Sequence, residues 1–250
     1  MSDKTKVKED TSPVVERFLR YKLVVQGRSP KTVEEYRIDL HTFFSYLIAT
    51  RAGLSPSDDG FYDVSISGVD NDFVKSVTTL DILEFLVYTA NERGNSTASR
   101  ARKLSALKAF FKYMVATEKV MEKNPAIDIE TPKRKASLPK YLTESESVSL
   151  LSSVLDDTES RTKERDFCII TLFLNCGMRL SELVGINLSD IDRELRSMRV
   201  VGKGNKERIV YLNDACREAL TAYLNCRAKN METIKDKNAL FISRLGKRIS

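Results

Sequence analysis

The chain has 250 residues, of which 42% are hydrophobic and 30% charged, with a formal net charge of +6. This length and composition allow two compact domains and exclude a protein that depends on disulfides for its core. No apolar run approaches the eighteen residues of a membrane-spanning helix, and none follows the polar start, so we expect a soluble, cytoplasmic protein without membrane contact. Four cysteines without a Cys-x-x-Cys pair and a single histidine predict neither a metal site nor a cofactor.

Basic charge is concentrated in one segment of the chain. Between Arg93 and Lys140, twelve Lys and Arg residues stand against four Asp and Glu residues. Such a concentration favours a polyanionic partner. A solvated basic helix face explains the charge equally well.

The first part of the chain predicts a small all-helical domain over residues 11–125. Residues 1–10 are polar and are expected to form a disordered tail. Ser29 before Pro30 is an N-cap signal, and residues 53–72, rich in Gly, Ser and Asp, predict a long loop. Apolar periodicity predicts four helices: from about Val14 to Gly27, from Pro30 past Leu47, from a cap at Thr78 or Thr79 to about Asn91, and from Ser96 to about Glu118.

Residues 126–140 predict a basic linker between two domains. Asn124 and Pro125 end the helical pattern, and the prolines that follow favour extended chain. Residues 141–250 predict the second domain. Its first helix should begin at a capping box formed by Thr143 and Glu146.

The second domain combines helical patterns with a hairpin signal. Residues 167–175 are almost uniformly apolar and predict a helix buried in the core. Residues 198–201 and 209–212 are β-prone runs on either side of Gly-Lys-Gly-Asn, which predicts a hairpin. Residues 214–229 predict a helix and 239–242 a further strand. The expected fold class is therefore mainly α with a small β-hairpin or sheet.

Arg179 and Glu182 form the first candidate site. Gly177 should end a helix and expose Arg179, whose planar guanidinium stays ionised and can donate two parallel hydrogen bonds to a phosphate. Glu182 follows three residues later, on the same side of a helical turn, and can hold the guanidinium in place. A surface ion pair without function is the simpler alternative.

Lys203 is the second candidate, between two glycines at the tip of the predicted hairpin. The glycines allow the backbone to approach another surface closely. A lysine there could protonate a leaving oxygen if its pKa were lowered. Alternatively, Lys203, Lys206 and Arg208 contact phosphates or only make the hairpin soluble.

Three motifs lie between residues 172 and 212: Cys-Gly-Met-Arg-Leu-Ser-Glu-Leu, then Leu-Ser-Asp-Ile-Asp, then the glycine-lysine hairpin. Together they resemble the catalytic domain of the tyrosine recombinases of the phage integrase family, in particular the Xer type. Upstream, Ser29 to Tyr36, Arg100 to Phe111 and Asn124-Pro125-Ala126 resemble the SAM-like, four-helix core-binding domain of that family. The resemblance covers nearly the whole chain.

The resemblance implies a mechanism and roles for three residues. In the family, a tyrosine attacks the scissile phosphate to give a 3′-phosphotyrosyl link and a free 5′-hydroxyl, without metal or nucleotide. Arg179 would be the first catalytic arginine, Glu182 its acidic neighbour and Lys203 the lysine that assists the leaving oxygen. The implied function is site-specific recombination or integration of double-stranded DNA, by a tetramer on paired DNA sites when the protein has its full length.

The second half of the family's site is expected to be missing from this sequence. The family has a second arginine in a His-x-x-Arg motif, a further His or Trp and the nucleophilic tyrosine after the hairpin. Here the single histidine is His41, and Tyr211 and Tyr223 are expected to be packing residues. We therefore expect residues 141–250 to be the first part of an incomplete catalytic domain, inactive as it stands.

Eight residues are candidates for DNA contact, and each could instead be ordinary surface charge. They are Lys31, Thr32, Arg37, Arg100, Arg102 and Lys108 in the helical domain and Lys206 and Arg208 in the hairpin. The alternative hypothesis for the whole chain is a non-catalytic DNA-binding protein on a recombinase scaffold. An RNA-binding helical protein is less favoured because no aromatic platform for stacking bases is evident.

Overall fold

The computed structural model describes residues 10–133, 138, 140–202, 204–229 and 233–250. The chain forms two compact units, Met1–Ser137 and Leu138–Ser250. Each unit has a hydrophobic core of its own. The predicted tail lies outside the described residues except for Asp10, which accepts hydrogen bonds from the backbone N–H of Ile66.

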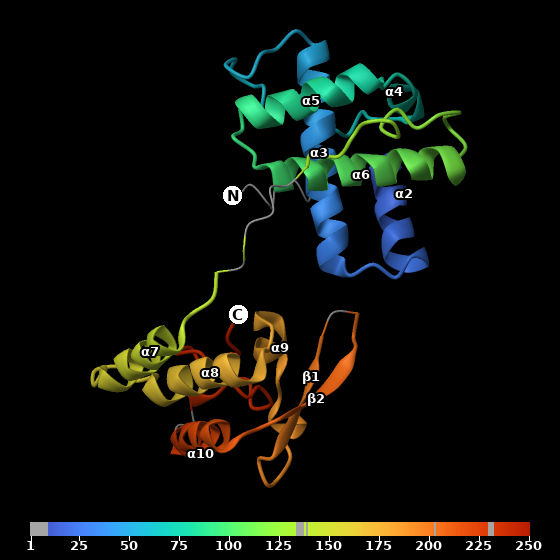
Figure 1. Cartoon of the computed structure of the whole chain (residues 1–250). Coiled ribbons are helices and arrows are strands. Elements are labelled where there is room, and N and C mark those ends of the chain that lie inside the picture. The colour runs from blue at the N-terminus through green and yellow to red at the C-terminus, as the bar shows by residue number, and fades with distance from the viewer. Residues whose placement is uncertain (1–9, 134–137, 139, 203, 230–232) are drawn as a thin grey trace. The chain divides into compact units, whose positions relative to one another are not determined.

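The first unit is a set of helices (Figure 1). Aromatic side chains make up much of its core. The long helix α3 (Pro30–Arg51) packs against α2 (Pro13–Arg20), α5 (Thr79–Asn91) and α6 (Thr97–Ala116). Six phenylalanines in this core are fully buried, and their rings meet mostly edge to face, as the aromatic quadrupole favours. The helices are α2 (Pro13–Arg20), the π-helical η1 (Tyr21–Val25), α3 (Pro30–Arg51), α4 (Asn71–Lys75), α5 (Thr79–Asn91) and α6 (Thr97–Ala116).

Local capping explains where these helices begin. Ser29 caps α3 by accepting a hydrogen bond from the N–H of Thr32, with Pro30 in the first turn. Thr78 and Asp81 form a reciprocal capping box at the start of α5. The four predicted helices are confirmed, but the prediction lacked the short helix α4, which sequence periodicity cannot reveal in five residues.

The predicted loop and the predicted linker both contribute to the first core. Phe61, Ile66 and Val69 of the loop are buried, which fixes it on the helices. Ala126 and Ile129 are buried as well, although residues 126–140 were expected to form a linker. The reason is a contact with α6, because the ammonium of Lys108 donates a hydrogen bond to the carbonyl of Ile129 at 2.7 Å.

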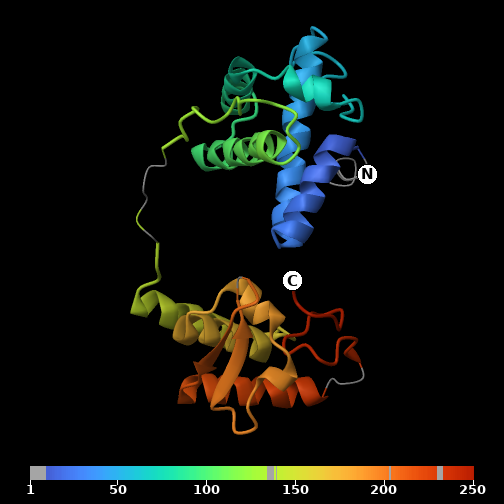
Figure 2. The same ribbon diagram turned by 90° about the vertical axis from the view of Figure 1, so that its right-hand side faces the viewer.

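The second unit combines helices with a two-stranded antiparallel sheet. Helix α8 (Lys163–Cys176) packs against α7 (Glu144–Asp156) and α10 (Asp214–Lys229). Figure 1 shows the hairpin at one end of this unit and α7 at the other, and Figure 2 shows α10 lying lengthwise along it. The elements are α7 (Glu144–Asp156), α8 (Lys163–Cys176), α9 (Leu180–Gly185), the 3-10 helix η2 (Leu188–Asp190), β1 (Ser197–Val201), β2 (Glu207–Tyr211) and α10 (Asp214–Lys229).

The predicted capping box, hairpin and last helix of the second unit are confirmed, and two other expectations are corrected. Residues 239–242 form no strand; Ala239 and Ile242 each make an isolated bridge instead. Helix α8 is buried along one stripe only, and Leu174 remains 39% exposed. Helix α7, which packs against α8, contributes no buried residue either.

Candidate active site

Arg179 stands at a sharp turn between two helices. Gly177 ends α8 with φ of 55° and ψ of 35°, in the left-handed region that favours glycine. Met178 is buried and anchors the turn, while Arg179 takes the N-cap position of α9 in an extended conformation. The side chain of Arg179 is consequently 68% exposed.

Glu182 is the buried centre of the site. Its Oε2 accepts a hydrogen bond from the backbone N–H of Arg179 at 3.0 Å. Its Oε1 accepts one from Nη1 of Arg179 at 2.7 Å and one from Nη1 of Arg208 at 2.6 Å. The hydrogen bond from Arg208, then those from Arg179, lower the pKa of Glu182 to about 2. One ionised carboxylate therefore serves two guanidiniums, which leaves a net positive charge facing solvent.

The hairpin reaches this carboxylate through a glycine. Arg208 on β2 lies opposite Val200 on β1. A Cβ on Gly202, just beyond β1, would lie 2.9 Å from Oε1 of Glu182. Close approach of the hairpin to the carboxylate therefore requires a glycine at this position. The next residue, Lys203, lies outside the described residues.

A second ion-pair cluster holds the base of the hairpin. Arg199 on β1 donates to Asp190 of η2 at 2.6 Å and to Glu207 on β2 at 3.0 Å. Asp190 also accepts from the backbone N–H of Asn187 at 2.9 Å. The hairpin is thus tied to the segment that follows α9, which keeps Arg208 beside Glu182.

The candidate DNA contacts of the hairpin differ in their surroundings. Lys206 is exposed, and its carbonyl accepts a hydrogen bond from the N–H of Gly202 at 2.7 Å. Arg208 is 41% exposed but directs one nitrogen to Glu182. It was expected to contact phosphates, and the geometry gives it a supporting role toward Glu182 in addition.

In the first unit, Lys31 and Thr32 are exposed in the first turn of α3. Arg37 is 15% exposed and pairs with Glu16, so its guanidinium is occupied within the fold. Lys108 is held by the carbonyl of residue 129, as described above.

Two further candidates, both on α6, also form hydrogen bonds or ion pairs within the fold. Arg100 donates to the carbonyl of Asn95 at 2.7 Å. Arg102 pairs with buried Asp39 at 2.6 Å and with Glu35 at 2.8 Å, and it keeps 41% of its side chain exposed.

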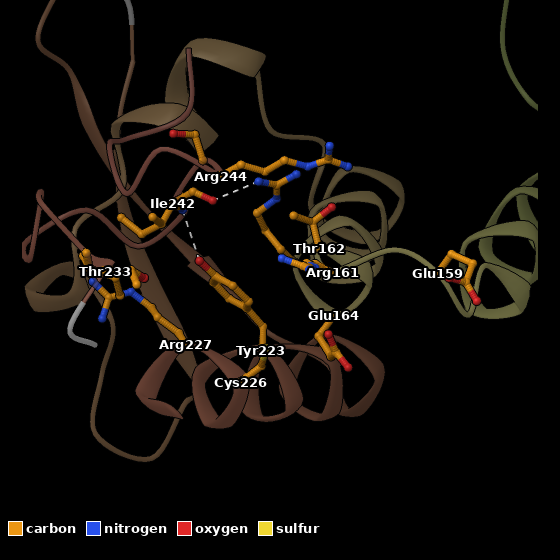
Figure 3. A pocket seen from close by; sticks show the side chains of 13 residues that line it. Glu159, Arg161, Thr162, Glu164, Tyr223, Cys226, Arg227, Thr233, Ile242 and Arg244 are labelled. Carbon is orange, nitrogen blue, oxygen red and sulfur yellow. Dashed lines mark hydrogen bonds between the residues drawn. The ribbon is translucent and has the colours of Figure 1, made fainter. Parts of the chain in front are cut away.

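A cavity of about 550 Å³ lies elsewhere in the second unit (Figure 3). Tyr223 on its wall is buried; its hydroxyl donates to the carbonyl of Leu240 at 2.9 Å and accepts from the N–H of Ile242 at 3.2 Å. Tyr223 is therefore a packing residue, as expected. Tyr211, expected to pack as well, is instead 81% exposed.

Sequence reasoning missed two features of the site. The pairing of Arg208 with Glu182 joins residues 26 positions apart, and no local pattern indicates it. The role of Gly202 had a signal, since a glycine directly after a β-prone run indicates a close approach of another group. Among the described residues, no cluster of three or more His, Cys, Asp or Glu is placed to hold a metal ion.

Comparison with known proteins identifies the family. The model of the phage integrase family matches residues 140–250, and that of the phage integrase N-terminal SAM-like domain matches residues 70–118. Tyrosine recombinase XerC of Myxococcus xanthus is 36% identical over 96% of this chain and 73% of its own length. The chain belongs to the tyrosine recombinases of the phage integrase family, and the predicted family is confirmed.

Other relatives agree with this assignment. XerC of Caldanaerobacter subterraneus subsp. tengcongensis is 46% identical over 95% of this chain, and the chain spans 65% of the length of that relative. XerD of Proteus mirabilis is 33% identical over 97% of this chain and 70% of its own length.

Solved structures share the fold. The XerH recombinase bound to its palindromic difH substrate has a TM-score of 0.67 at 21% identity, over 95% of this chain and 73% of that one. A lambda integrase tetramer bound to a Holliday junction has a TM-score of 0.60 at 18% identity, over 95% of this chain and 60% of that one. The predicted fold class is therefore confirmed. None of the helices in the described part of the chain is both long and apolar enough to span a bilayer.

Proposed function

We propose that the chain binds double-stranded DNA and that Arg179 contacts the phosphate at which a strand is cut and rejoined. The observation that carries this proposal is an exposed guanidinium fixed on a buried, ionised carboxylate. The side chain of such an arginine is already held in place, so it loses little conformational freedom when it donates hydrogen bonds to non-bridging phosphate oxygens.

The complete reaction is part of the same proposal. It is site-specific recombination through a 3′-phosphotyrosyl intermediate, carried out by a tetramer on paired DNA sites. Support comes from the relatives, which are named tyrosine recombinases, and from the lambda integrase structure, which is a tetramer on a Holliday junction. Because the chain spans 65% of the length of the XerC relative from Caldanaerobacter, we propose the reaction for the full-length protein.

The role proposed for Lys203 rests on the resemblance to the family, and the other roles rest on the exposure of the described side chains. We assign Lys203 to assist the leaving oxygen and Lys206 to contact a phosphate. Exposed Lys31 and Thr32 on α3 are proposed to contact the DNA backbone, and so are Arg100 and Arg102 on α6, which belong to the basic segment between Arg93 and Lys140. The cytoplasm is the proposed location, in line with four cysteines that are all thiols.

The test is a coupling experiment between Arg179 and a single phosphate. Preferred duplexes are first selected from random sequences, and each phosphate of the bound site is then replaced in turn by an uncharged methylphosphonate. At the contacted position we expect binding to weaken by about tenfold in the unchanged chain, because a charged hydrogen bond is lost. The same replacement should not change the binding affinity of the Arg179→Ala variant, because that variant no longer makes the contact.

Arg196→Ala is the matched control, since Arg196 is 73% exposed and pairs with Glu194 on the surface. It should retain the full methylphosphonate effect. If no phosphate position shows coupling to Arg179, the alternative of a DNA-binding protein that uses the scaffold without a catalytic phosphate contact is favoured instead.

A further inference from the structure

Three of the four cysteines lie together in the second unit, outside the site described above. Cys168 and Cys216 are buried, and Cys176 is partly exposed. Sγ of Cys176 lies 3.8 Å from Sγ of Cys216. Cys176 is the last residue of α8, and Cys216 lies in the first turn of α10.

The two helix ends are held in this arrangement by a neighbouring contact. Asn213, just before α10, donates a hydrogen bond through Nδ2 to Oδ1 of Asn175 at 2.8 Å. Its own Oδ1 accepts from the backbone N–H of Cys216 at 3.0 Å. A disulfide requires a sulfur–sulfur distance of about 2.05 Å, so the two sulfurs need to approach by about 1.8 Å.

We propose that Cys176 and Cys216 form an oxidisable dithiol, a modification site that a hydroperoxide converts into an intramolecular disulfide. The thiolate of Cys176 attacks one peroxide oxygen, the O–O bond breaks, and an alcohol or water leaves. The sulfur of Cys216 then attacks the resulting sulfenic acid, and water is released. In sum, two thiols and one hydroperoxide give one disulfide, one alcohol and one water.

Exposure determines which sulfur reacts first. Cys176 is reached from solvent, whereas Cys216 is buried. Burial raises the pKa of Cys216 to about 12 and also raises that of Cys176. Because the thiolate is the nucleophile, the reaction should be slow at neutral pH and accelerate as the pH rises.

The modification would act next to the candidate active site. Gly177 and Met178 are the only residues between Cys176 and Arg179. A disulfide would join the end of α8, from which this turn emerges, to the start of α10. It would also close a loop of 40 residues and so stabilise the second unit.

The experiment uses the 250-residue chain, exposed to hydrogen peroxide and, in a second series, to oxidised glutathione. We expect the intact mass to fall by two hydrogen atoms and peptide mapping to join the peptides of Cys176 and Cys216. The thermal unfolding midpoint of the second unit should rise on the order of 10 °C and return after reduction.

Variants locate the bond. Cys176→Ser and Cys216→Ser should each abolish the disulfide, and Cys168→Ser and Cys226→Ser, the matched controls, should retain it. Peptide mapping of the unchanged chain needs no variant, so the test holds even if a variant does not fold. Four thiols that persist in oxidant, a stable glutathione adduct on Cys176, or a disulfide between any other pair would each overturn the proposal.

Discussion

Glu182 holds two guanidinium groups in position. Its carboxylate is buried, and both arginine side chains extend from it to the solvent. Its side chain is fully buried, whereas those of Arg179 and Arg208 are 68% and 41% exposed. A buried carboxylate that lost these partners would have an uncompensated charge, which is costly in a protein interior. The two arginines therefore support the fold at the same point where they are offered to a phosphate.

Glu182→Gln should lower the free energy of unfolding of the second unit by about 1 to 2 kcal/mol, because the hydrogen bonds from the two guanidiniums lose the negative charge of their acceptor. The exposed arginines are screened by water, which keeps the effect below that of a fully buried pair. Urea unfolding followed by circular dichroism measures it. Glu194→Gln, at an exposed pair with Arg196, should change stability by much less, and an equal loss in the two variants would contradict this account.

The lowered pKa of Glu182 predicts a dependence of stability on pH. The pKa is about 2 in the folded chain and near its ordinary value of 4.5 when unfolded, so the unfolded state binds the proton first. The contribution to stability is thus present above about pH 4.5 and is lost as the pH falls toward 2. Urea midpoints measured across this window should fall less steeply for Glu182→Gln than for the unchanged chain. Parallel curves would show that Glu182 does not titrate in this way.

At the scale of elements, the β-hairpin and the turn between α8 and α9 form one structural unit. Arg199 ties β1 to η2, and Arg208 ties β2 to Glu182 in α9. Gly202 lets the end of β1 lie against the carboxylate. A change that moves the hairpin should therefore remove the hydrogen bond of Arg208 to the carboxylate that also holds Arg179.

Gly202→Ala should destabilise the second unit by about 1 kcal/mol or more, because the added methyl would meet Oε1 of Glu182 at 2.9 Å. The methylphosphonate coupling to Arg179 should weaken at the same time. Gly185→Ala is the control: a Cβ there meets nothing within 4 Å. A neutral result for Gly202→Ala, in both stability and coupling, would show that the hairpin can shift without affecting the carboxylate.

For the whole molecule, the concentration of basic residues between Arg93 and Lys140 predicts DNA binding that depends strongly on salt. If about five phosphates are neutralised, the logarithm of affinity should fall against the logarithm of salt concentration with a slope of roughly −4 to −5. Fluorescence anisotropy with a labelled duplex, at salt concentrations from about 50 to about 200 mM, measures the slope. A slope near zero would exclude an electrostatic interface.

Two variants in α3 distinguish an exposed basic side chain from one that is already ion-paired within the fold. Lys31→Ala should reduce the size of the slope by about one, because Lys31 is exposed. Arg37→Ala should leave the slope nearly unchanged, because Arg37 is already paired with Glu16. The opposite order would show that Arg37 exchanges its partner for a phosphate.

The sequence by itself determined the features that depend on neighbouring residues. Ser29, Thr78 and Thr143 fix the starts of α3, α5 and α7 through bonds that span three residues, and the same local logic pairs Arg179 with Glu182. The turn of the hairpin is equally local. These features can be predicted from the sequence because the interacting groups are only a few residues apart and meet whenever the turn forms.

Tertiary structure alone decided the contacts between distant parts of the chain. The pairing of Glu182 with Arg208, the burial of Ala126 and Ile129 in the first core, and the contact between Cys176 and Cys216 all join separate elements. Each depends on how helices and strands pack, because desolvation and ion pairing require partners that sequence spacing does not bring together. For this reason the chemistry of the candidate site could be predicted from Arg179, whereas the way its charge is balanced could not.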